Sequence, residues 1–337
     1  MESKPAIAAH WSTPVLESVL PVVEMSQHVR TSPEAVRSVA GWMAHEEFTF
    51  PHGSVTGNGT RSLDPHQIMD STFFETLLNF AFTDFDTGIK YTVTEDGCTY
   101  SDTEGMTVRI QEAIDTGIPI LEGGYLAGVT RGDLEKIFAG DTEMPMLDER
   151  VEILNEAGTI LVDRYNGRFH NFVADCTPAQ YADGDGILER LVDEFPRFND
   201  ESDYHGSPVK IYKLAQLGLW VLHRALRGSG TWQLTDIDTM TAFADYIVPV
   251  GLNLMGVLEY TDDLSDRIAN GIMLERDSDE EIEIRAHTLY ATALLTDAIN
   301  EIRPADAQLL IPEIDYRFWK TYHATFKPHH LTRTTMY

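Results

Sequence analysis

Cysteine and basic residues are scarce in this sequence of 337 residues. The two cysteines, Cys98 and Cys176, cannot build a disulfide framework, and neither lies in a CxxC or Cys/His zinc-binding spacing. Lysine and arginine number 25 against 54 aspartates and glutamates, which gives a formal net charge of −29. Such a surface repels polyanions, so we expect neither a long nucleic acid nor a membrane as a partner. The cysteine usage fits a reducing compartment, and we expect a cytoplasmic protein.

Long hydrophobic runs and the common catalytic motifs are also missing. No stretch of about 18 consecutive apolar residues predicts a transmembrane helix. Pro5, Pro14 and Pro21 interrupt the apolar run that a signal peptide would need. P-loop, HExxH and nucleophile-elbow patterns are absent, and "GDGILE" lacks the third glycine of a dinucleotide fingerprint. The sequence therefore indicates no organic cofactor and no metal.

Apolar residues, by contrast, make up 43% of the sequence and are spread along it, which predicts a folded core. Most segments carry helical periodicity and helix-start signals such as Ser32 before Pro33. We expect a mainly α protein of roughly ten helices, with one small β-hairpin near residues 89–101 that turns at Asp96-Gly97. Residues 31–337 are expected to form a single helical domain, on which residues 1–30 pack as an N-terminal extension.

One predicted helix has a polar face whose role the sequence leaves open. The stretch "SPVKIYKLAQLGLWVLHRAL" is expected to start a helix at Ser207-Pro208. Within it, Lys213, Gln216 and Trp220 share one face by their spacing, while apolar residues cover most of the rest. This face either lines a polar pocket or is the solvated side of an ordinary helix.

The stretch "TAFADYIVPV" combines helix-like apolar periodicity with Asp245 and Pro249. On periodicity alone, the apolar residues at helical spacing between Met240 and Leu258 form one stripe of a helix. Asp245 lies off this stripe as a solvated carboxylate. Pro249, however, has no N–H, and its ring collides with the carbonyl of Asp245, four residues earlier. We therefore expect the helix to begin late or to kink here.

The C-terminal stretch "RFWKTYHATFKPHHLTRTTMY" is the most basic part of the chain, because histidines and aromatics surround Arg317, Lys320, Lys327 and Arg333. Two interpretations remain open. Either these residues pair with the acidic remainder of the chain, or they form a site for a small anion such as one phosphate.

Nine stretches occur in the order and at spacings comparable to those of one known family: "IKYTVTEDGCTY", "EAIDTGIPI", "MPMLDERVEILNEAGTIL", "VKIYKLAQ", "TMTAFADYIVP", "LEYTDDL", "EEIEIRAH", "IDYRFW" and "HHLTRTTMY". From about residue 45 onward the chain thus resembles the queuosine salvage protein family, the queuosine 5′-phosphate N-glycosylases that release the base queuine. The resemblance implies a mainly helical domain similar to helical DNA glycosylases, acting on a free nucleotide rather than on tRNA.

The resemblance also implies roles for residues. "FADY" makes Asp245 the catalytic carboxylate, with Phe243 and Tyr246 beside it in the base pocket, and "YKLAQ" makes Lys213 the phosphate ligand. In "NFAFT", Thr83 stands where the family has a tryptophan. Further substrate contacts or supporting groups come from the other matched stretches: Asp315, Trp319, Glu283, Arg285, Asn79 and Phe80.

These residue types suit hydrolysis of an N-glycosidic bond. The ribose gains oxocarbenium character as the base leaves, and a fixed carboxylate stabilises that charge and orients water. The expected partner is the nucleotide queuosine 5′-phosphate, or a closely related modified nucleotide, and the oligomeric state is not predicted. Two other readings remain: a non-catalytic carrier of a queuine-like base, and a structural scaffold.

Overall fold

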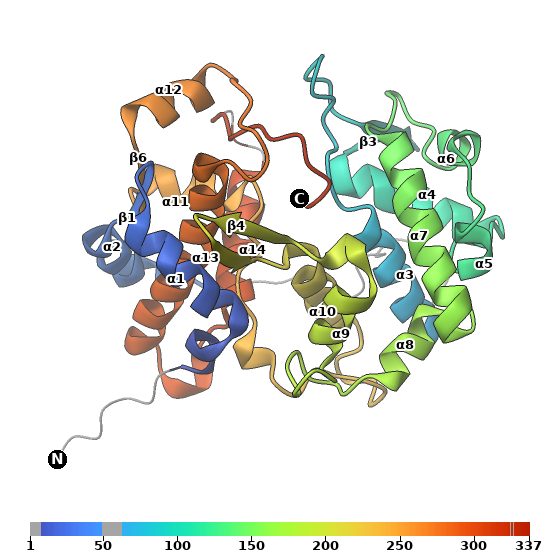
Figure 1. Ribbon diagram of the computed structural model, residues 1–337, viewed down its shortest axis with the longest axis horizontal. Coiled ribbons are helices and arrows are strands. Elements are labelled where there is room, and N and C mark those ends of the chain that lie inside the picture. Colours follow the sequence, from blue (N-terminus) through green and yellow to red (C-terminus); the bar gives the residue numbers. More distant parts are fainter. Residues whose placement is uncertain (1–7, 49–62, 324, 326) are drawn as a thin grey trace. The chain divides into compact units, whose positions relative to one another are not determined.

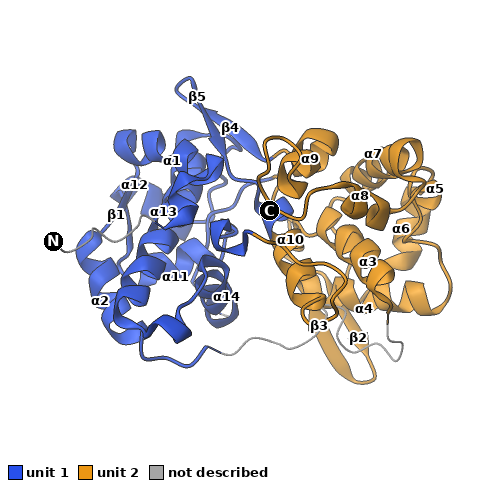
Figure 2. Ribbon diagram, turned by 90° about the horizontal axis from the view of Figure 1, so that it is seen from below, with its two compact units in different colours: residues 1–51, 200–216, 236–333 blue, residues 52–199, 217–235, 334–337 orange. Residues whose placement is uncertain are grey.

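The computed structural model describes residues 8–48, 63–323, 325 and 327–337 (Figure 1). These residues form fourteen α-helices, α1 to α14, and three two-stranded antiparallel sheets. The mainly α class is thereby confirmed. By its contacts the chain divides into two compact units (Figure 2): unit 1, residues 1–51, 200–216 and 236–333, and unit 2, residues 52–199, 217–235 and 334–337. The single domain expected over residues 31–337 remains a prediction.

Unit 1 contains the N-terminal helices, the C-terminal helices and two of the sheets. Its elements are η1 (Ala9–Ser12), α1 (Pro14–Met25), β1 (Val29–Thr31), α2 (Pro33–Met43), β4 (Glu201–Tyr204), β5 (Ser207–Lys210), the first residues of α10 (Lys213–Ala225), η3 (Ile237–Thr239), α11 (Val248–Leu254), β6 (Leu258–Tyr260), α12 (Asp262–Ala269), α13 (Asp279–Ile302), η4 (Ala305–Ala307) and α14 (Ile311–Tyr322).

Helix α13 is the centre of unit 1. Apolar and small residues lie on nearly all of its faces, which is typical of a helix enclosed in a core. Helices α1, α2, α11 and α14 all pack against it, and Figure 1 shows α1 and α2, in blue, beside α13. Each large apolar side chain buried in such a core contributes roughly 1.5–3 kcal/mol relative to exposure. The buried cluster includes Val36, Met43, Leu252, Leu258, Ile284, Leu295, Ile299, Ile314 and Phe318.

Gly251 allows α11 to lie directly on α14. A Cβ atom at this position would meet the Phe318 ring at 2.6 Å and the Tyr322 ring at 2.6 Å. Any larger residue would therefore push the two helices apart. This close approach matters because α11 begins just after Asp245, and α14 carries Asp315.

Unit 2 contains the hairpin and most of the shorter helices. Its elements are α3 (Pro65–Leu77), β2 (Thr92–Glu95), β3 (Cys98–Ser101), α4 (Asp102–Asp115), α5 (Gly123–Leu126), α6 (Arg131–Ile137), α7 (Leu147–Tyr165), α8 (Phe169–Asp175), α9 (Ile187–Glu194), η2 (Pro196–Phe198) and the remainder of α10.

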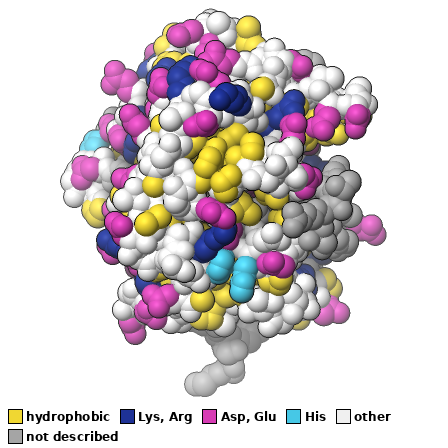
Figure 3. All heavy atoms as spheres, turned by 90° about the vertical axis from the view of Figure 1, so that its right-hand side faces the viewer, with side chains coloured by type: hydrophobic (Ala, Val, Ile, Leu, Met, Phe, Trp, Pro, Cys, Tyr) yellow, Lys and Arg dark blue, Asp and Glu magenta, His cyan; other side chains and the backbone are white. Residues whose placement is uncertain are grey.

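Stacked aromatic side chains form the core of unit 2. The rings of Phe73 on α3 and Phe169 on α8 lie 4.0 Å apart and nearly parallel. Phe195 contacts Phe73 edge-on at 5.3 Å and Phe172 at 5.3 Å. Such pairs add about 0.5–1.5 kcal/mol each beyond the area they bury. On the face displayed in Figure 3, acidic and basic side chains alternate around a group of hydrophobic ones.

Two local predictions are confirmed at this level. Ser32 caps α2, because its hydroxyl accepts the N–H of Ala35 at 3.3 Å. The predicted hairpin is β2–β3, and its turn residues Asp96 and Gly97 both have positive φ, of 51° and 80°. Among the described helices, none combines the length and the apolar character needed to cross a bilayer.

The predicted helix start at Ser207-Pro208 is wrong. Residues 207–210 are strand β5, which pairs with β4. His205 and Gly206 between the strands have φ values of 54° and 87°, so they form the same kind of tight turn as the β2–β3 hairpin. Helix α10 begins later, at Lys213.

The single apolar helix stripe over residues 240–258 is also wrong, whereas the late helix start is confirmed. Residues 240–247 are not helical, and α11 covers only Val248–Leu254 with Pro249 in its first turn. A proline lacks the N–H that the first turn of a helix leaves unsatisfied, so it is well tolerated there. The chain then continues into β6, which pairs with β1.

Candidate functional site

Asp245 lies in unit 1 at the end of the non-helical segment before α11. Its Oδ1 atom accepts the N–H groups of Ile247 at 2.8 Å and Val248 at 2.9 Å. The carboxylate therefore satisfies two amides at the start of a helix that Pro249 forces to begin late. Both bonds end on Oδ1, so they fix the orientation of the carboxyl group without engaging Oδ2.

Three buried polar side chains hold the segment that precedes Asp245. Gln216 Oε1 on α10 accepts both the N–H and the hydroxyl of Thr241, each at 3.0 Å. Asp315 Oδ2 on α14 accepts the N–H of Phe243 at 2.8 Å.

The third side chain is Arg285 on α13, whose Nε donates to the carbonyl of Ala244 at 3.2 Å. Thr241, Phe243 and Ala244 are thus each held by a different helix. These hydrogen bonds restrain the position of the loop and therefore that of Asp245.

Asp245 and Asp315 form an electrostatically coupled pair. Burial, and then the negative charge of Asp245, raise the pKa of Asp315 to about 8. Burial also raises the pKa of Asp245, although the Lys213 ammonium, two backbone amides and His323 act in the opposite direction. Asp245 has more groups that stabilise its anion, which favours the charge on Asp245 and the proton on Asp315. Two nearby carboxyl groups with separated pKa values are suited to acid–base chemistry.

Lys213 is the first residue of α10 and is 5% exposed. Gln216, one turn further on, is fully buried. The interpretation of this face as an ordinary solvated side is therefore wrong for these two residues. The ammonium of Lys213 acts on the pKa values of both Asp245 and Asp315, which places a positive charge within reach of the carboxyl pair.

Aromatic and imidazole rings lie next to this pair in unit 1. The ring of Tyr246 lies 4.5 Å from that of His329, and the ring of Trp319 lies 4.7 Å from that of His323. His329 also lines a cavity of about 130 Å³ together with Pro249 and other residues of α11, α12 and the C-terminal stretch. Phe243, whose N–H is held by Asp315, is buried.

Glu283 lies only two residues before Arg285 but serves another part of unit 1. Its Oε2 accepts the N–H groups of His28 at 2.7 Å and Val29 at 2.9 Å. Its Oε1 accepts the N–H of Gln27 at 3.0 Å and the hydroxyl of Tyr204 at 2.8 Å. These four donors from the chain itself occupy the carboxylate, so it holds the turn between α1 and β1.

Asn79 and Phe80 belong to unit 2, directly after α3. Phe80 is 1% exposed, and the guanidinium groups of Arg150 and Arg197 lie 4.2 Å and 4.8 Å from the centre of its ring. Asn79 is partly buried beside it. Within unit 2, Phe80 is thus a core residue enclosed by two cations.

Asp200 is the main site residue absent from the sequence-based predictions. It is buried and accepts a bidentate pair of hydrogen bonds from Arg285, at 2.9 and 2.6 Å. Nothing in "FNDES" distinguishes it from the surface acids nearby.

The two interpretations of the C-terminal stretch can also be compared with the structure. Arg317 pairs with Glu46 through two bonds of 3.0 and 2.9 Å, which supports the pairing interpretation at that position.

Among the described residues, no group of three or more His, Cys, Asp or Glu side chains could hold a metal ion.

Comparison with known proteins places this geometry in context. A family model described as queuosine salvage protein matches residues 61–337. Three similar proteins are each named queuosine 5′-phosphate N-glycosylase/hydrolase. The one from Sphaerobacter thermophilus is 32% identical over 334 residues, which are 96% of this chain and 97% of its own length. The Bos taurus protein is 30% identical and covers 88% of this chain and 84% of its own length. The Mus musculus protein is 29% identical, with 90% and 91% covered.

Proposed function

The chain belongs to the queuosine salvage protein family, and from that membership we propose that it hydrolyses the N-glycosidic bond of queuosine 5′-phosphate. Water adds to the anomeric carbon, the bond to the base breaks, and ribose 5-phosphate and queuine are released for salvage into tRNA. The observation that carries the proposal is the pairing of the half-buried Asp245 with the buried Asp315, two carboxyl groups whose pKa values the Lys213 ammonium lowers. The names of the relatives support the same reaction, because this chain aligns with nearly the full length of the Sphaerobacter thermophilus and Mus musculus proteins.

Asp245 is the proposed catalytic carboxylate. A cation develops on the ribose as the bond to the base lengthens, and a fixed anion beside it lowers the energy of that transition state. The two amide bonds to Oδ1 support this role, because they hold the carboxyl group in one orientation before the substrate binds. Oδ2 would face the sugar and orient or deprotonate the attacking water.

Asp315 complements this charge as a neutral acid. With its pKa raised to about 8, it keeps its proton at neutral pH and adds no second negative charge to the site. It also holds the Phe243 amide and so fixes the segment that carries Asp245. A protonated carboxyl group can donate a hydrogen bond to the departing base, which accumulates negative charge.

Lys213 is the proposed ligand of the 5′-phosphate. A lysine ammonium is a compact point charge, and the N-terminus of a helix favours anions. Both features coincide at the first residue of α10. Binding the phosphate, which does not react, holds the glycosidic bond in position for attack.

The base pocket is proposed to use Phe243, Tyr246 and Trp319, whose rings suit stacking on a planar base. Asn79 and Phe80 remain predicted contacts, and Arg285 supports Asp245 through the carbonyl of Ala244. Glu283 receives no binding role, since four donors of the chain occupy it. We also propose a cytoplasmic location, which the free thiols of Cys98 and Cys176 support.

The decisive experiment is to incubate the purified protein with queuosine 5′-phosphate and to measure free queuine by chromatography. Asp245→Asn keeps the shape of the side chain but removes the charge, and it should lower kcat by a factor of about a hundred to a thousand, equivalent to about 3–4 kcal/mol. Asp297→Asn is the matched control, because Asp297 bonds Trp11 and His10 in the same unit and should leave kcat unchanged.

Equal rates for wild type and Asp245→Asn would remove Asp245 from the mechanism. Tight binding of the nucleotide without release of the base would instead support the carrier function.

A further inference from the structure

Asp200 accepts hydrogen bonds from three successive amides at the corner between β5 and α10. Its carbonyl accepts the N–H groups of Ile211 at 3.0 Å and Tyr212 at 3.3 Å, and its Oδ2 accepts the N–H of Lys213 at 3.3 Å. Asp200 itself is 3% exposed, so these bonds are shielded from water. The first residue of α10 is therefore attached to Asp200 by its own amide and by the two amides before it.

This corner contains a strained residue. Tyr212 has a φ of 52°, in the left-handed region that costs an L-residue other than glycine roughly 1–2 kcal/mol. Such a conformation persists only where the surrounding bonds impose it. Asp200 supplies the bonds on both sides of Tyr212, and Gln216 adds one from its Nε2 to the carbonyl of Ile211 at 3.1 Å.

The other side of Asp200 leads to the catalytic segment. Its carboxylate receives both terminal nitrogens of Arg285, at 2.9 and 2.6 Å, and the two side chains are 4% and 2% exposed. The same guanidinium donates from Nε to the carbonyl of Ala244, the residue before Asp245. An unbroken path of hydrogen bonds thus connects the amide of Lys213 with the backbone of Asp245.

We propose that Asp200 is a positioning residue that fixes the distance between the Lys213 ammonium and the Asp245 carboxylate. The inference rests on the proposed function, in which one group binds the phosphate and the other acts at the anomeric carbon of the same nucleotide. Asp200 itself touches neither the substrate nor the reacting atoms. A carboxylate is required here because one group must accept two guanidinium bonds and a helix-start amide, and must neutralise a buried cation.

Two variants separate the two ends of this path. Asp200→Asn removes the charge and at least one acceptor oxygen. It therefore weakens both the hydrogen bond to the Lys213 amide at the start of α10 and the paired hydrogen bonds to Arg285. Arg285→Lys keeps a cation beside Asp200 but loses the fork and the Nε bond to Ala244. Each variant is assayed well below its own melting temperature, and kcat is expressed per folded molecule.

The expected results differ between the variants. Asp200→Asn should lower kcat by about tenfold to a hundredfold, since a displacement of about 1 Å at a reacting group has effects of this size. It should also weaken binding of ribose 5-phosphate, measured by calorimetry, and reduce the preference for queuosine 5′-phosphate over the nucleoside. Arg285→Lys should lower kcat similarly but keep most of the affinity for ribose 5-phosphate, because Asp200 still holds the Lys213 amide.

Asp70→Asn is the matched control. Asp70 is also a buried carboxylate, at 4% exposure, and it accepts the N–H and the Nδ1 of His170 in unit 2. Its loss should lower the melting temperature without changing kcat per folded molecule or the phosphate preference.

The inference is overturned if Asp200→Asn retains the wild-type kcat and ribose 5-phosphate affinity, or if Asp70→Asn reduces both equally. A wild-type protein that releases no base would contradict the proposed function. In that case the ribose 5-phosphate affinity of the variants still decides the role of Asp200. Should Asp200→Asn fail to fold, Arg285→Lys decides it: unchanged kcat overturns the inference.

Discussion

Both units bury arginine side chains, and the guanidinium groups of Arg285 in unit 1 and Arg150 in unit 2 are satisfied in different ways. Arg285 of unit 1 donates to the carboxylate of Asp200 and to the carbonyl of Ala244, and the carboxylate of Glu281 lies 3.8 Å from its guanidinium group. Arg150 of unit 2 is 0% exposed, and its recorded hydrogen bonds all end on main-chain carbonyls, those of Pro145, Leu78, Phe80 and Ala81.

We interpret Arg150 as a structural cation and Arg285 as a cation that supports the proposed active site. Carbonyl groups do not titrate, so these hydrogen bonds of Arg150 depend on the path of the chain after α3 and just before α7. Burial lowers its pKa to about 9, which still leaves it charged at neutral pH. Around Arg285, by contrast, charges of both signs lie close together, and a change in one alters the protonation of the others. We therefore expect unit 2 to lose stability when Arg150 is changed, and unit 1 to lose function when Arg285 is changed.

The largest expected effect is on Arg150. Arg150→Met keeps the volume of the side chain but leaves four buried carbonyls without their donor, and each unsatisfied group costs about 1–3 kcal/mol. We therefore expect a loss of roughly 4 kcal/mol or more in the free energy of unfolding, measured by urea titration. Arg150→Lys is the control, since it keeps the charge and should recover only part of the loss. If Arg150→Met is as stable as the wild type, Arg150 does not have the structural role that we assign to it.

The second prediction concerns Lys213, on the functional side of the comparison. Lys213→Ala should reduce kcat/KM for queuosine 5′-phosphate by about tenfold to a hundredfold, because a charge-assisted contact contributes about 1.5–3 kcal/mol. The nucleoside lacks the phosphate, and its kcat/KM should change much less. Steady-state kinetics with both substrates makes this comparison. Equal losses for the two substrates would contradict the phosphate role.

The segments around Lys213 and Asp245 also show which helix starts could be predicted from the sequence and which could not. Pro249 predicted a late helix, and the structure has it, with Asp245 bonded to the amides that the late start leaves open. The helix start at Ser207 was misplaced because Ser-Pro also begins strands, and a three- or four-residue strand has too few positions to show alternation. For the same reason the β1–β6 and β4–β5 pairs were missed.

Asp200 could not be predicted from local pattern at all. Its partner Arg285 lies 85 residues further along the chain, so only the folded arrangement brings them together. Glu283 illustrates the reverse case, since the one matched stretch "EEIEIRAH" implied a role at the site for both Glu283 and Arg285. On a helix, residues two apart point to different sides, and here one side meets Asp200 while the other meets the turn after α1.

A third prediction tests the protonation of Asp315. Its pKa is raised from 3.8 in the unfolded chain to about 8, so the folded protein binds one proton more between these values. Stability from this group is fully present below about pH 4 and is lost as the pH rises toward 8. Asp315→Asn is neutral at every pH and should show a flatter decline of the melting temperature between pH 5 and pH 9.

The same substitution should change the pH profile of catalysis. Above pH 8 the wild type gains a second buried negative charge, so its kcat/KM should fall by about tenfold per pH unit. Asp315→Asn should lack this limb if the neutral form serves to hold Phe243, and should be slow at every pH if the proton itself is transferred. A wild-type profile that is flat to pH 10 would contradict a neutral Asp315.

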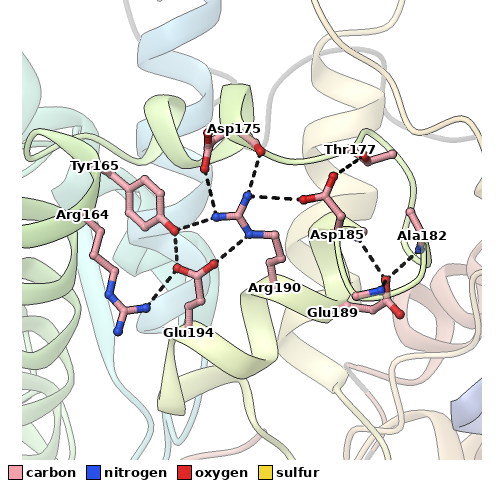
Figure 4. A network of polar contacts seen from close by, with 11 residues as sticks. Arg164, Tyr165, Asp175, Thr177, Ala182, Asp185, Glu189, Arg190 and Glu194 are labelled. Atoms are coloured by element: carbon pink, nitrogen blue, oxygen red, sulfur yellow. Dashed lines mark hydrogen bonds and ion pairs between the residues drawn. The ribbon is translucent and has the colours of Figure 1, made fainter.

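The smallest expected effect concerns Arg190 of unit 2, whose side chain is 18% exposed and whose partner Glu194 is 11% exposed, while its other acidic partners are open to water. Figure 4 shows Arg190 of α9 between Asp175, Asp185 and Glu194, with the Tyr165 hydroxyl also in contact. The carboxylates of Asp175 and Asp185 are more than half exposed, at 65% and 61%. Exposed ion pairs contribute about 0–1 kcal/mol each, and salt weakens them.

Arg190→Gln should therefore lower the free energy of unfolding by only about 1 kcal/mol, although Arg190 has more acidic partners than Arg285. The difference from wild type should shrink between 0.05 and 0.5 M NaCl in a urea titration, whereas that of Arg150→Met should not. A large loss that is insensitive to salt would mean that the number of partners, rather than their burial, determines how much an arginine stabilises this protein.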